Sequence, residues 1–100
     1  TMVARAQGLS GRGELGDDEG MYFIFSTSSV QGFWMKDMKF AIDIIWLDEN
    51  NTIVGLKTDA KPDSYPTVFY PESDAKYVIE ATSGFINDKK LHIGQKVILK

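Results

Sequence analysis

The segment Ile42–Leu47 constrains the fold more than any other part of this chain, because it is apolar on both faces of a strand. Successive side chains of a β-strand point to opposite faces. One face carries Ala41, Asp43, Ile45 and Leu47, and the other carries Ile42, Ile44 and Trp46. A strand of this kind has to be covered on both sides. We therefore expect it in the middle of a sheet, with other parts of the chain packed on each face.

The rest of the chain has the pattern of a mostly β domain. The turn-forming cluster Asp48–Asn51 is followed by the strand-like run Thr52–Thr58, which predicts a hairpin. Four further runs have strand length, namely Met21–Ser26, Phe33–Lys36, Tyr77–Thr82 and Gln95–Leu99. Pro62, Pro66 and Pro71 confine the segment between them to loop or edge strand. Six short strands separated by turns predict a small β-sandwich or barrel.

One short helix is expected at the start of the chain, over Met2–Ser10, with Thr1 as its cap. The 100 residues suit a single domain spanning positions 1–100. With no cysteine, the chain cannot form a disulfide, a thiolate nucleophile or a zinc knuckle. We expect neither a cofactor nor a metal, because His92, the single histidine, has no further ligands at a suitable spacing beside Met35 and Met38.

Charge and hydropathy narrow the classes of partner. Eleven basic and 14 acidic residues give a net charge of −3, which disfavours a nucleic-acid surface, since phosphate contacts need clustered Lys and Arg. No apolar run approaches the roughly 20 residues that a transmembrane helix needs. We therefore expect no nucleic-acid partner and no membrane span in this chain.

Asp43 and Glu80 are the two carboxylates that stand within strand-like runs. Asp43 is either a site carboxylate or a structural acid that binds the backbone amides of a neighbouring loop, and the structural alternative is favoured. Glu80 is either buried beside Asp43 or on a half-solvated outer face, and the solvated face is favoured because Glu is seldom buried. Two adjacent carboxylates would form an acid–base pair or a cation site.

The sequence Phe33-Trp34-Met35-Lys36 is the second candidate for a site. Strand alternation places Trp34 and Lys36 on one side, where they can form a stacking surface with a cationic tip for a small anion or a sugar. The alternative is a core Trp with a Lys whose stem lies along it. Arg12 is either a fork for a carboxylate or phosphate or the partner of one of the two strand carboxylates, and the second role is favoured.

Together these motifs resemble a known family. The order Gly8-Leu9…Arg12, Gly20-Met21-Tyr22-Phe23, Phe33-Trp34-Met35-Lys36, Ile42-Asp43-Ile44-Ile45, Tyr77-Val78-Ile79-Glu80 and Ile93-Gly94 resembles the domain of unknown function 192 family (DUF192, also called UPF0127) of bacteria and archaea. The resemblance implies a β-sandwich or barrel of jelly-roll type and, in many full-length relatives, an export or lipoprotein signal. It therefore favours an extracytoplasmic location, and it supplies no activity, substrate or cofactor.

Three departures from the family pattern bear on the site and the fold. Asp37-Met38 stands where the family usually has Asn-Thr, Ala41-Ile42 where it has Pro-Leu, and Gly94-Gln95 where it has Gly-Asp. If the Asn-Thr pair holds a ligand in relatives, this chain has altered that contact. Relatives also have a strand before the position of Thr1. We expect either that a neighbouring chain fills the resulting sheet edge, as in a homo-oligomer, or that the remaining strands close up.

Three classes of function remain open. The first is a non-enzymatic module that binds a small polar ligand or an envelope partner through Arg12, Trp34, Lys36, Asp43 and Glu80. The second is a structural or protein-interaction domain whose adhesive surface is the Pro62–Pro71 segment; the alternative, that this segment is a loop folded back over the mouth of the barrel, is favoured. The third and weakest is a carbohydrate-directed hydrolase or lyase with Asp43 and Glu80 as acid and base.

Overall fold

Six strands and two short helical segments make up the part of the chain that the computed structural model describes, residues 20–30 and 32–97. The strands are β1 (Gly20–Ser29), β2 (Phe33–Trp34), β3 (Ile42–Leu47), β4 (Ile53–Ala60), β5 (Val68–Phe69) and β6 (Ala75–Thr82). A 3-10 helix, η1 (Pro62–Ser64), and one α-helical turn, α2 (Phe85–Asp88), complete the list. None of the helices in these ranges is long and apolar enough to cross a membrane.

Four of the strands form one antiparallel sheet in the order β1-β6-β3-β4. All six residues of β3 are buried, and its bounds are those predicted from the sequence. The hairpin of β3 with β4 is also confirmed, with Ile45 opposite Leu56 and Trp46 opposite Gly55. The strand is central because β6 pairs along its other edge.

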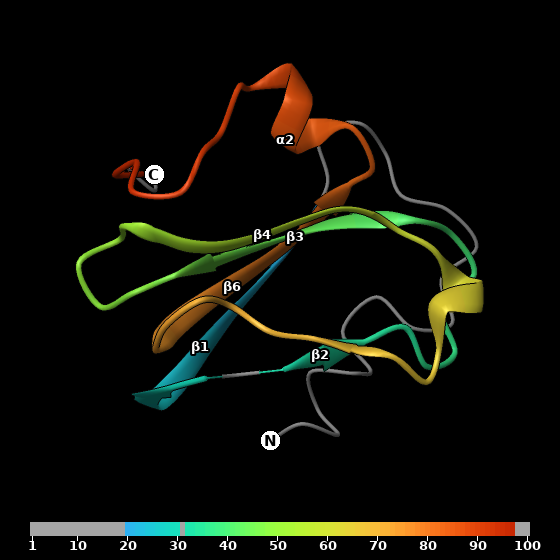
Figure 1. The fold of residues 1–100 in the computed structure, drawn as a ribbon, viewed down its shortest axis with the longest axis horizontal. Helices are drawn as coiled ribbons and strands as arrows, with labels where there is room; N and C mark the ends of the chain where they lie inside the picture. The colour runs from blue at the N-terminus through green and yellow to red at the C-terminus, as the bar shows by residue number, and fades with distance from the viewer. Residues whose placement is uncertain (1–19, 31, 98–100) are drawn as a thin grey trace.

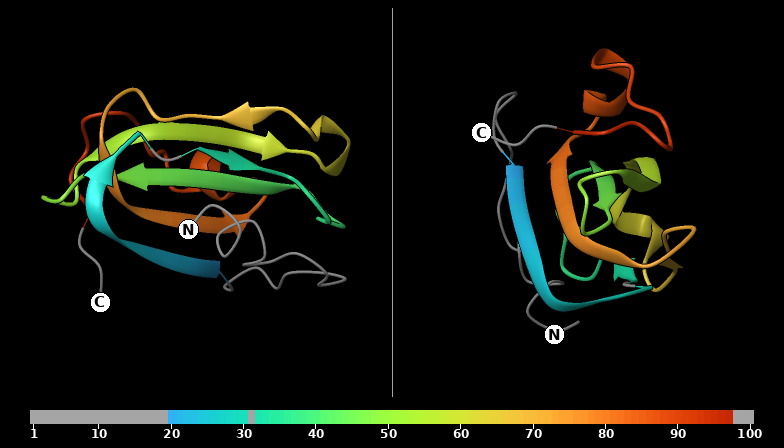
Figure 2. Two further views of the ribbon diagram at one scale, coloured as in Figure 1. Left: turned by 90° about the horizontal axis from the view of Figure 1, so that it is seen from below. Right: turned by 90° about the vertical axis from the view of Figure 1, so that its left-hand side faces the viewer.

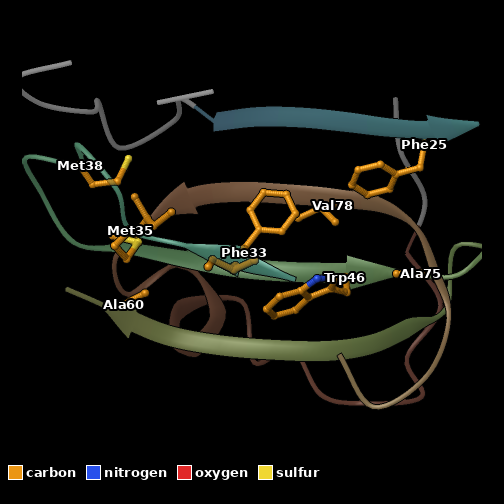
Figure 3. Close-up of a cluster of buried hydrophobic side chains, with 10 residues drawn as sticks. Phe25, Phe33, Met35, Met38, Trp46, Ala60, Ala75 and Val78 are labelled. Atoms are coloured by element: carbon orange, nitrogen blue, oxygen red, sulfur yellow. The ribbon is translucent and has the colours of Figure 1, made fainter. Parts of the chain in front are cut away.

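Two hydrophobic clusters cover the two faces of this sheet, as the apolar pattern of β3 requires. The larger cluster lies between the four-stranded sheet and the small β2–β5 sheet, and its ten buried members are Phe25, Phe33, Met35, Met38, Ile42, Ile44, Trp46, Ala60, Ala75 and Val78 (Figure 3). The smaller cluster comprises Ile45, Leu47, Ile53 and Ile86, and α2 and the segment after it pack over it. Figure 1 shows the resulting layers, with α2 on one side of the main sheet and β2 on the other.

The β2–β5 sheet closes the larger cluster. Its two residue pairs are Phe33 opposite Phe69 and Trp34 opposite Val68. Phe33 is buried and Phe69 packs against the core, so Trp34 and Val68 face away from it. The end of β1 bends toward β2, after a register irregularity between Ile24 and Ser29 (Figure 2).

The prediction of a mostly β fold is confirmed, with its sheets antiparallel, and several finer expectations are not. Neither sheet closes into a barrel within the described ranges, and the jelly-roll topology stays a prediction. The predicted helix Met2–Ser10 lies outside the described residues, whereas α2 was not predicted. The run Gln95–Leu99 shows a single bridge, between Thr52 and Lys96, within its described part. Pairing of a sheet edge with a second chain also stays a prediction.

Candidate functional site

The five residues predicted for a site do not lie together. Arg12 is outside the described residues. Asp43 is on β3, Glu80 is on β6, and Trp34 and Lys36 belong to β2 and the turn after it. Of the four described residues, the structure brings only Trp34 and Lys36 together.

Asp43 is fully buried, and both oxygens of its carboxylate accept hydrogen bonds from the backbone. The N–H of Asp59 donates to Oδ1 at 2.8 Å, and the N–H of Ile86 donates to Oδ2 at 2.8 Å. Asp43 thus links β3 to β4 on one side and to α2 on the other. This arrangement corresponds to the structural alternative of the sequence analysis, because the carboxylate satisfies backbone donors that the ladder leaves unpaired.

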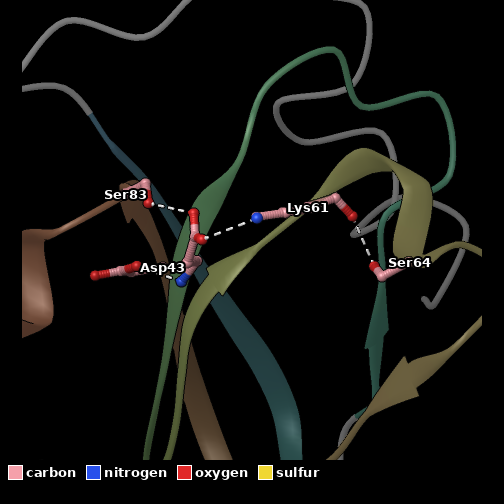
Figure 4. Close-up of polar contacts among 5 residues, drawn as sticks. Asp43, Lys61, Ser64 and Ser83 are labelled. Carbon is pink, nitrogen blue, oxygen red and sulfur yellow. Dashed lines mark hydrogen bonds and ion pairs between the residues drawn. The ribbon is translucent and has the colours of Figure 1, made fainter.

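The contact with Asp59 explains a distortion of β4. Between Ile44–Lys57 and Ile42–Ala60 the register advances two residues in β3 and three in β4, which defines a β-bulge. Asp59 lies in that bulge with a φ of 49°, and its exposed carboxylate accepts a hydrogen bond from Ser83 Oγ at 2.8 Å. Lys61 Nζ lies 3.7 Å from the other oxygen. Figure 4 shows the buried Asp43 beneath this surface network.

Glu80 is buried as well, at 3% exposure, so the expected solvated position is wrong. The physical reason is that β6 lies between β1 and β3, which place Met21 and Ile44 directly opposite Glu80. Ile44 belongs to the larger cluster, so Glu80 faces that layer of the molecule.

The two buried carboxylates point to opposite faces of the main sheet. Residues directly opposite each other in an antiparallel pair share a face. Asp43 stands opposite Ala81, whereas Glu80 stands opposite Ile44, the immediate chain neighbour of Asp43. Asp43 and Glu80 therefore do not share a cleft, and they do not form the acid–base pair that the hydrolase or lyase alternative requires.

Trp34 and Lys36 form the cationic stacking arrangement that strand alternation indicated, and a third residue joins them. Lys36 Nζ lies 5.8 Å from the centroid of the Trp34 ring, which is within the range of a cation–π interaction. The ring of Tyr65 lies 5.2 Å from that of Trp34, at an interplanar angle of 55°. We call Trp34 and Tyr65 the aromatic platform. Tyr65 is 44% exposed, and Trp34 is half-buried.

The indole N–H of Trp34 is a polar group in an unusual position. Its nitrogen, Nε1, is buried, and no group among the described residues accepts its hydrogen. Buried indole N–H groups normally have a partner.

The outer face of the β2–β5 sheet extends the exposed aromatic surface beyond the platform. Tyr70 is 62% exposed and lies over Gly32, where an added Cβ would be 2.7 Å from the ring atom Cε1 of Tyr70. Val68, which stands opposite Trp34 on the neighbouring strand, is half-buried. Sequence reasoning identified the Pro62–Pro71 segment as apolar but did not connect Tyr65 with Trp34. The proximity depends on the turn through η1, which no local pattern reveals.

Asp37 and Met38, the first of the three expected departures from the family pattern, lie in a turn and in the core. Asp37 has a φ of 60°, in the left-handed region that Asn and Asp tolerate better than most residues. Met38 is 7% exposed and belongs to the larger cluster, as does Met35. The described residues contain no group of three or more His, Asp or Glu side chains that could hold a metal ion.

Three comparisons place the chain among known proteins. It is similar to a UPF0127 protein of Pyrococcus furiosus, at 33% identity over 70 residues, which are 70% of this chain and 54% of that protein. The chain thus spans about half the length of this curated relative. Among solved structures, it is similar to a protein of unknown function from Novosphingobium aromaticivorans, with a TM-score of 0.88 and 28% identity over 99% of this chain and 70% of the other.

A second solved structure supports the fold alone. It is a protein from Sinorhizobium meliloti 1021, described as a proposed transcription regulator, with a TM-score of 0.86 and 24% identity over 96% of this chain and 74% of that one. The family model of DUF192, described as an uncharacterised ACR family, matches residues 1–99. The match covers the candidate platform and both buried carboxylates. Because it spans nearly the whole sequence, the chain belongs to the DUF192 family.

Proposed function

We propose that this protein is a non-enzymatic module that binds a small polar ligand on the aromatic platform. The observation that carries the proposal is the contact of Trp34 with Tyr65, beside the ammonium group of Lys36, on the side of β2 that faces away from the core. Exposed aromatic rings that adjoin one another form the kind of patch that marks an interaction site, whereas single exposed residues are common. A flat ligand can cover such a ring while a nearby charge orients its polar groups.

The positions of the carboxylates support binding over catalysis. General acid–base work needs two groups within reach of one bond. The hydrogen bonds of Asp43 go to the backbone of β4 and α2, and Glu80 lies on the opposite face of the sheet. Neither residue belongs to the platform, so the proposed site is smaller than the five-residue set expected from the sequence.

The test is a thermal-shift screen of the wild type and the variant Trp34→Ala against sugars, peptidoglycan fragments, nucleotides, small carboxylates and phosphate. A ligand that binds only the native state raises the unfolding temperature, and a hundredfold excess over Kd adds about 2.7 kcal/mol of stability. We expect at least one compound to stabilise the wild type and not the variant. A screen in which every compound leaves both proteins unchanged would contradict the proposal.

A second candidate is a protein-interaction domain, favoured by the exposure of Tyr65 and Tyr70 on the outside of one small sheet. A protein partner would cover the whole outer face of the β2–β5 sheet. Tyr70→Ala distinguishes the candidates. It should leave a small ligand of the platform bound, whereas it should weaken a protein partner, because aromatic residues dominate binding energy at protein interfaces.

A further inference from the structure

We propose that the ligand of the aromatic platform is an acidic saccharide, that is, a pyranose ring bearing a carboxylate. This inference rests on the proposed function and assigns a chemical class to its ligand. It combines the geometry of the two rings, the cation beside them and the polar character of the residues next to Tyr65.

The geometry of the rings favours a ligand that lies on one ring over a ligand held between the two. Centroids 5.2 Å apart mean that Trp34 and Tyr65 contact each other directly, so no third ring fits between them. The ligand therefore covers the exposed surface of a ring. The face of an aromatic ring is electron-rich, and the C–H groups on one side of a pyranose present it with a weakly positive surface.

The surroundings of the platform favour a hydroxylated ring over an apolar one. Apolar ligands bind tightly in concave sites that bury most of their surface. Tyr65, by contrast, is 44% exposed and follows Ser64, whose hydroxyl donates to the carbonyl of Lys61 at 2.7 Å and keeps only its acceptor lone pairs; Thr67 stands two residues further along the chain. A saccharide that stacks on an open ring keeps its hydroxyl groups in contact with water and with such neighbours.

The charge beside the platform favours an acid. Lys36 Nζ lies over the Trp34 ring, 5.8 Å from its centroid, so the saccharide stacks on the more exposed ring of Tyr65 and its carboxylate is drawn toward the ammonium group beside that ring. Asp37, the next residue, is exposed and carries the opposite charge. Replacement of Asp37 by Asn should therefore strengthen binding of an acid.

The two tryptophans make the test specific. Trp46 is 1% exposed in the core, so its indole N–H signal serves as an internal control for that of Trp34 in a proton–nitrogen correlation spectrum. Titrations would use trigalacturonate, its fully methyl-esterified form, which has the same rings without charge, and benzoate. We expect trigalacturonate to move the Trp34 signal and leave that of Trp46 in place.

The variants separate stacking from charge. Trp34→Phe and Tyr65→Ala should each weaken binding of trigalacturonate by about tenfold, with unfolding temperatures recorded to show that they fold. Lys36→Gln should remove a two- to fivefold preference for the acid over its methyl ester, because exposed charge pairs contribute little. Lys39→Gln is the matched control, since it removes the charge of another exposed lysine three residues further along the chain.

The other outcomes overturn the inference in distinguishable ways. Equal binding of trigalacturonate and its ester would refute the acidic class but leave a saccharide site. Binding of benzoate without either saccharide would refute the saccharide and leave a polar-ligand site on the platform. If none of the three compounds moves the Trp34 signal, the acidic saccharide is wrong, and the broader screen decides the proposed function separately.

Discussion

Replacing Asp43 by Asn tests whether one buried carboxylate holds three elements of the fold together. Asp43 is fully buried, and each of its oxygens accepts one backbone N–H at 2.8 Å. An asparagine has one carbonyl oxygen and one NH2 group, so it can accept from Asp59 or from Ile86 but not from both. The backbone N–H that loses its acceptor then faces the NH2 group of the asparagine, which is itself a donor.

The magnitude follows from those two bonds. An unsatisfied buried donor costs about 1–3 kcal/mol, and the bond that survives is no longer charge-assisted. We therefore expect Asp43→Asn to lower the free energy of unfolding by about 2–3 kcal/mol, which corresponds to about 10–20 °C in unfolding temperature for a domain of this size.

Asp48 provides a matched control within the same hairpin. Its carboxylate also accepts two backbone N–H groups, from Asn50 at 2.8 Å and Thr52 at 3.0 Å, but both bonds go to the single oxygen Oδ1. An asparagine can keep both of them. Asp48→Asn makes both bonds neutral but leaves no donor unsatisfied, so it should lower the free energy of unfolding by less than about 1 kcal/mol, well below the loss in Asp43→Asn.

The assay is urea unfolding of both variants, combined with amide hydrogen exchange. In Asp43→Asn the amides of Asp59 and Ile86 should exchange faster, because the substitution removes at least one of their acceptors. A loss below about 0.5 kcal/mol in Asp43→Asn, or an equal loss in Asp48→Asn, would refute the reasoning.

Two further predictions test packing and titration. Gly55→Ala should lower the free energy of unfolding by about 1–3 kcal/mol, because the added Cβ would lie 2.7 Å from the backbone Cα of Pro71. Gly84 has a φ of 98° and open space around it, so Gly84→Ala should lower this free energy only by the left-handed backbone strain, about 1–2 kcal/mol. Urea unfolding measures both values. Partial desolvation of Tyr22, which remains 44% exposed, and secondarily the neighbouring Tyr77 raise the pKa of Tyr22 above its usual 10. The small stability linked to this group is therefore present below pH 10 and is lost as the pH rises through the folded pKa. Tyr77→Phe should lower the pKa of Tyr22 without restoring its usual value, since burial persists; an unchanged NMR titration of Tyr22 would contradict the assigned contribution of Tyr77.

The central hairpin of the fold was predictable because the residue pattern that specifies it lies within one short stretch of the sequence. The alternating pattern of Ile42–Leu47 identifies a strand buried on both faces, and the turn residues after it identify the hairpin. The helix α2 was not predictable in the same way. It is a single turn that follows Gly84 in a left-handed conformation, and its first backbone amides are held partly by Asp43, 43 residues earlier in the chain. Contacts of that range leave no periodic signal.

The site depended on register, which strand patterns do not fix between strands distant in sequence. Side chains alternate with a period of two, so a shift of one residue between β3 and β6 would bring Glu80 opposite Asp43 and onto its face. The observed register places Ala81 there, and the two acids are separated by the sheet itself. Trp34 and Lys36 were predictable as neighbours because both lie within one local run, whereas Tyr65 reaches them only through the fold. A residue pair inferred within one local run therefore deserves more weight than a pair inferred across two strands, and on that ground the pair Trp34 and Lys36 is a stronger hypothesis for a site than the pair Asp43 and Glu80.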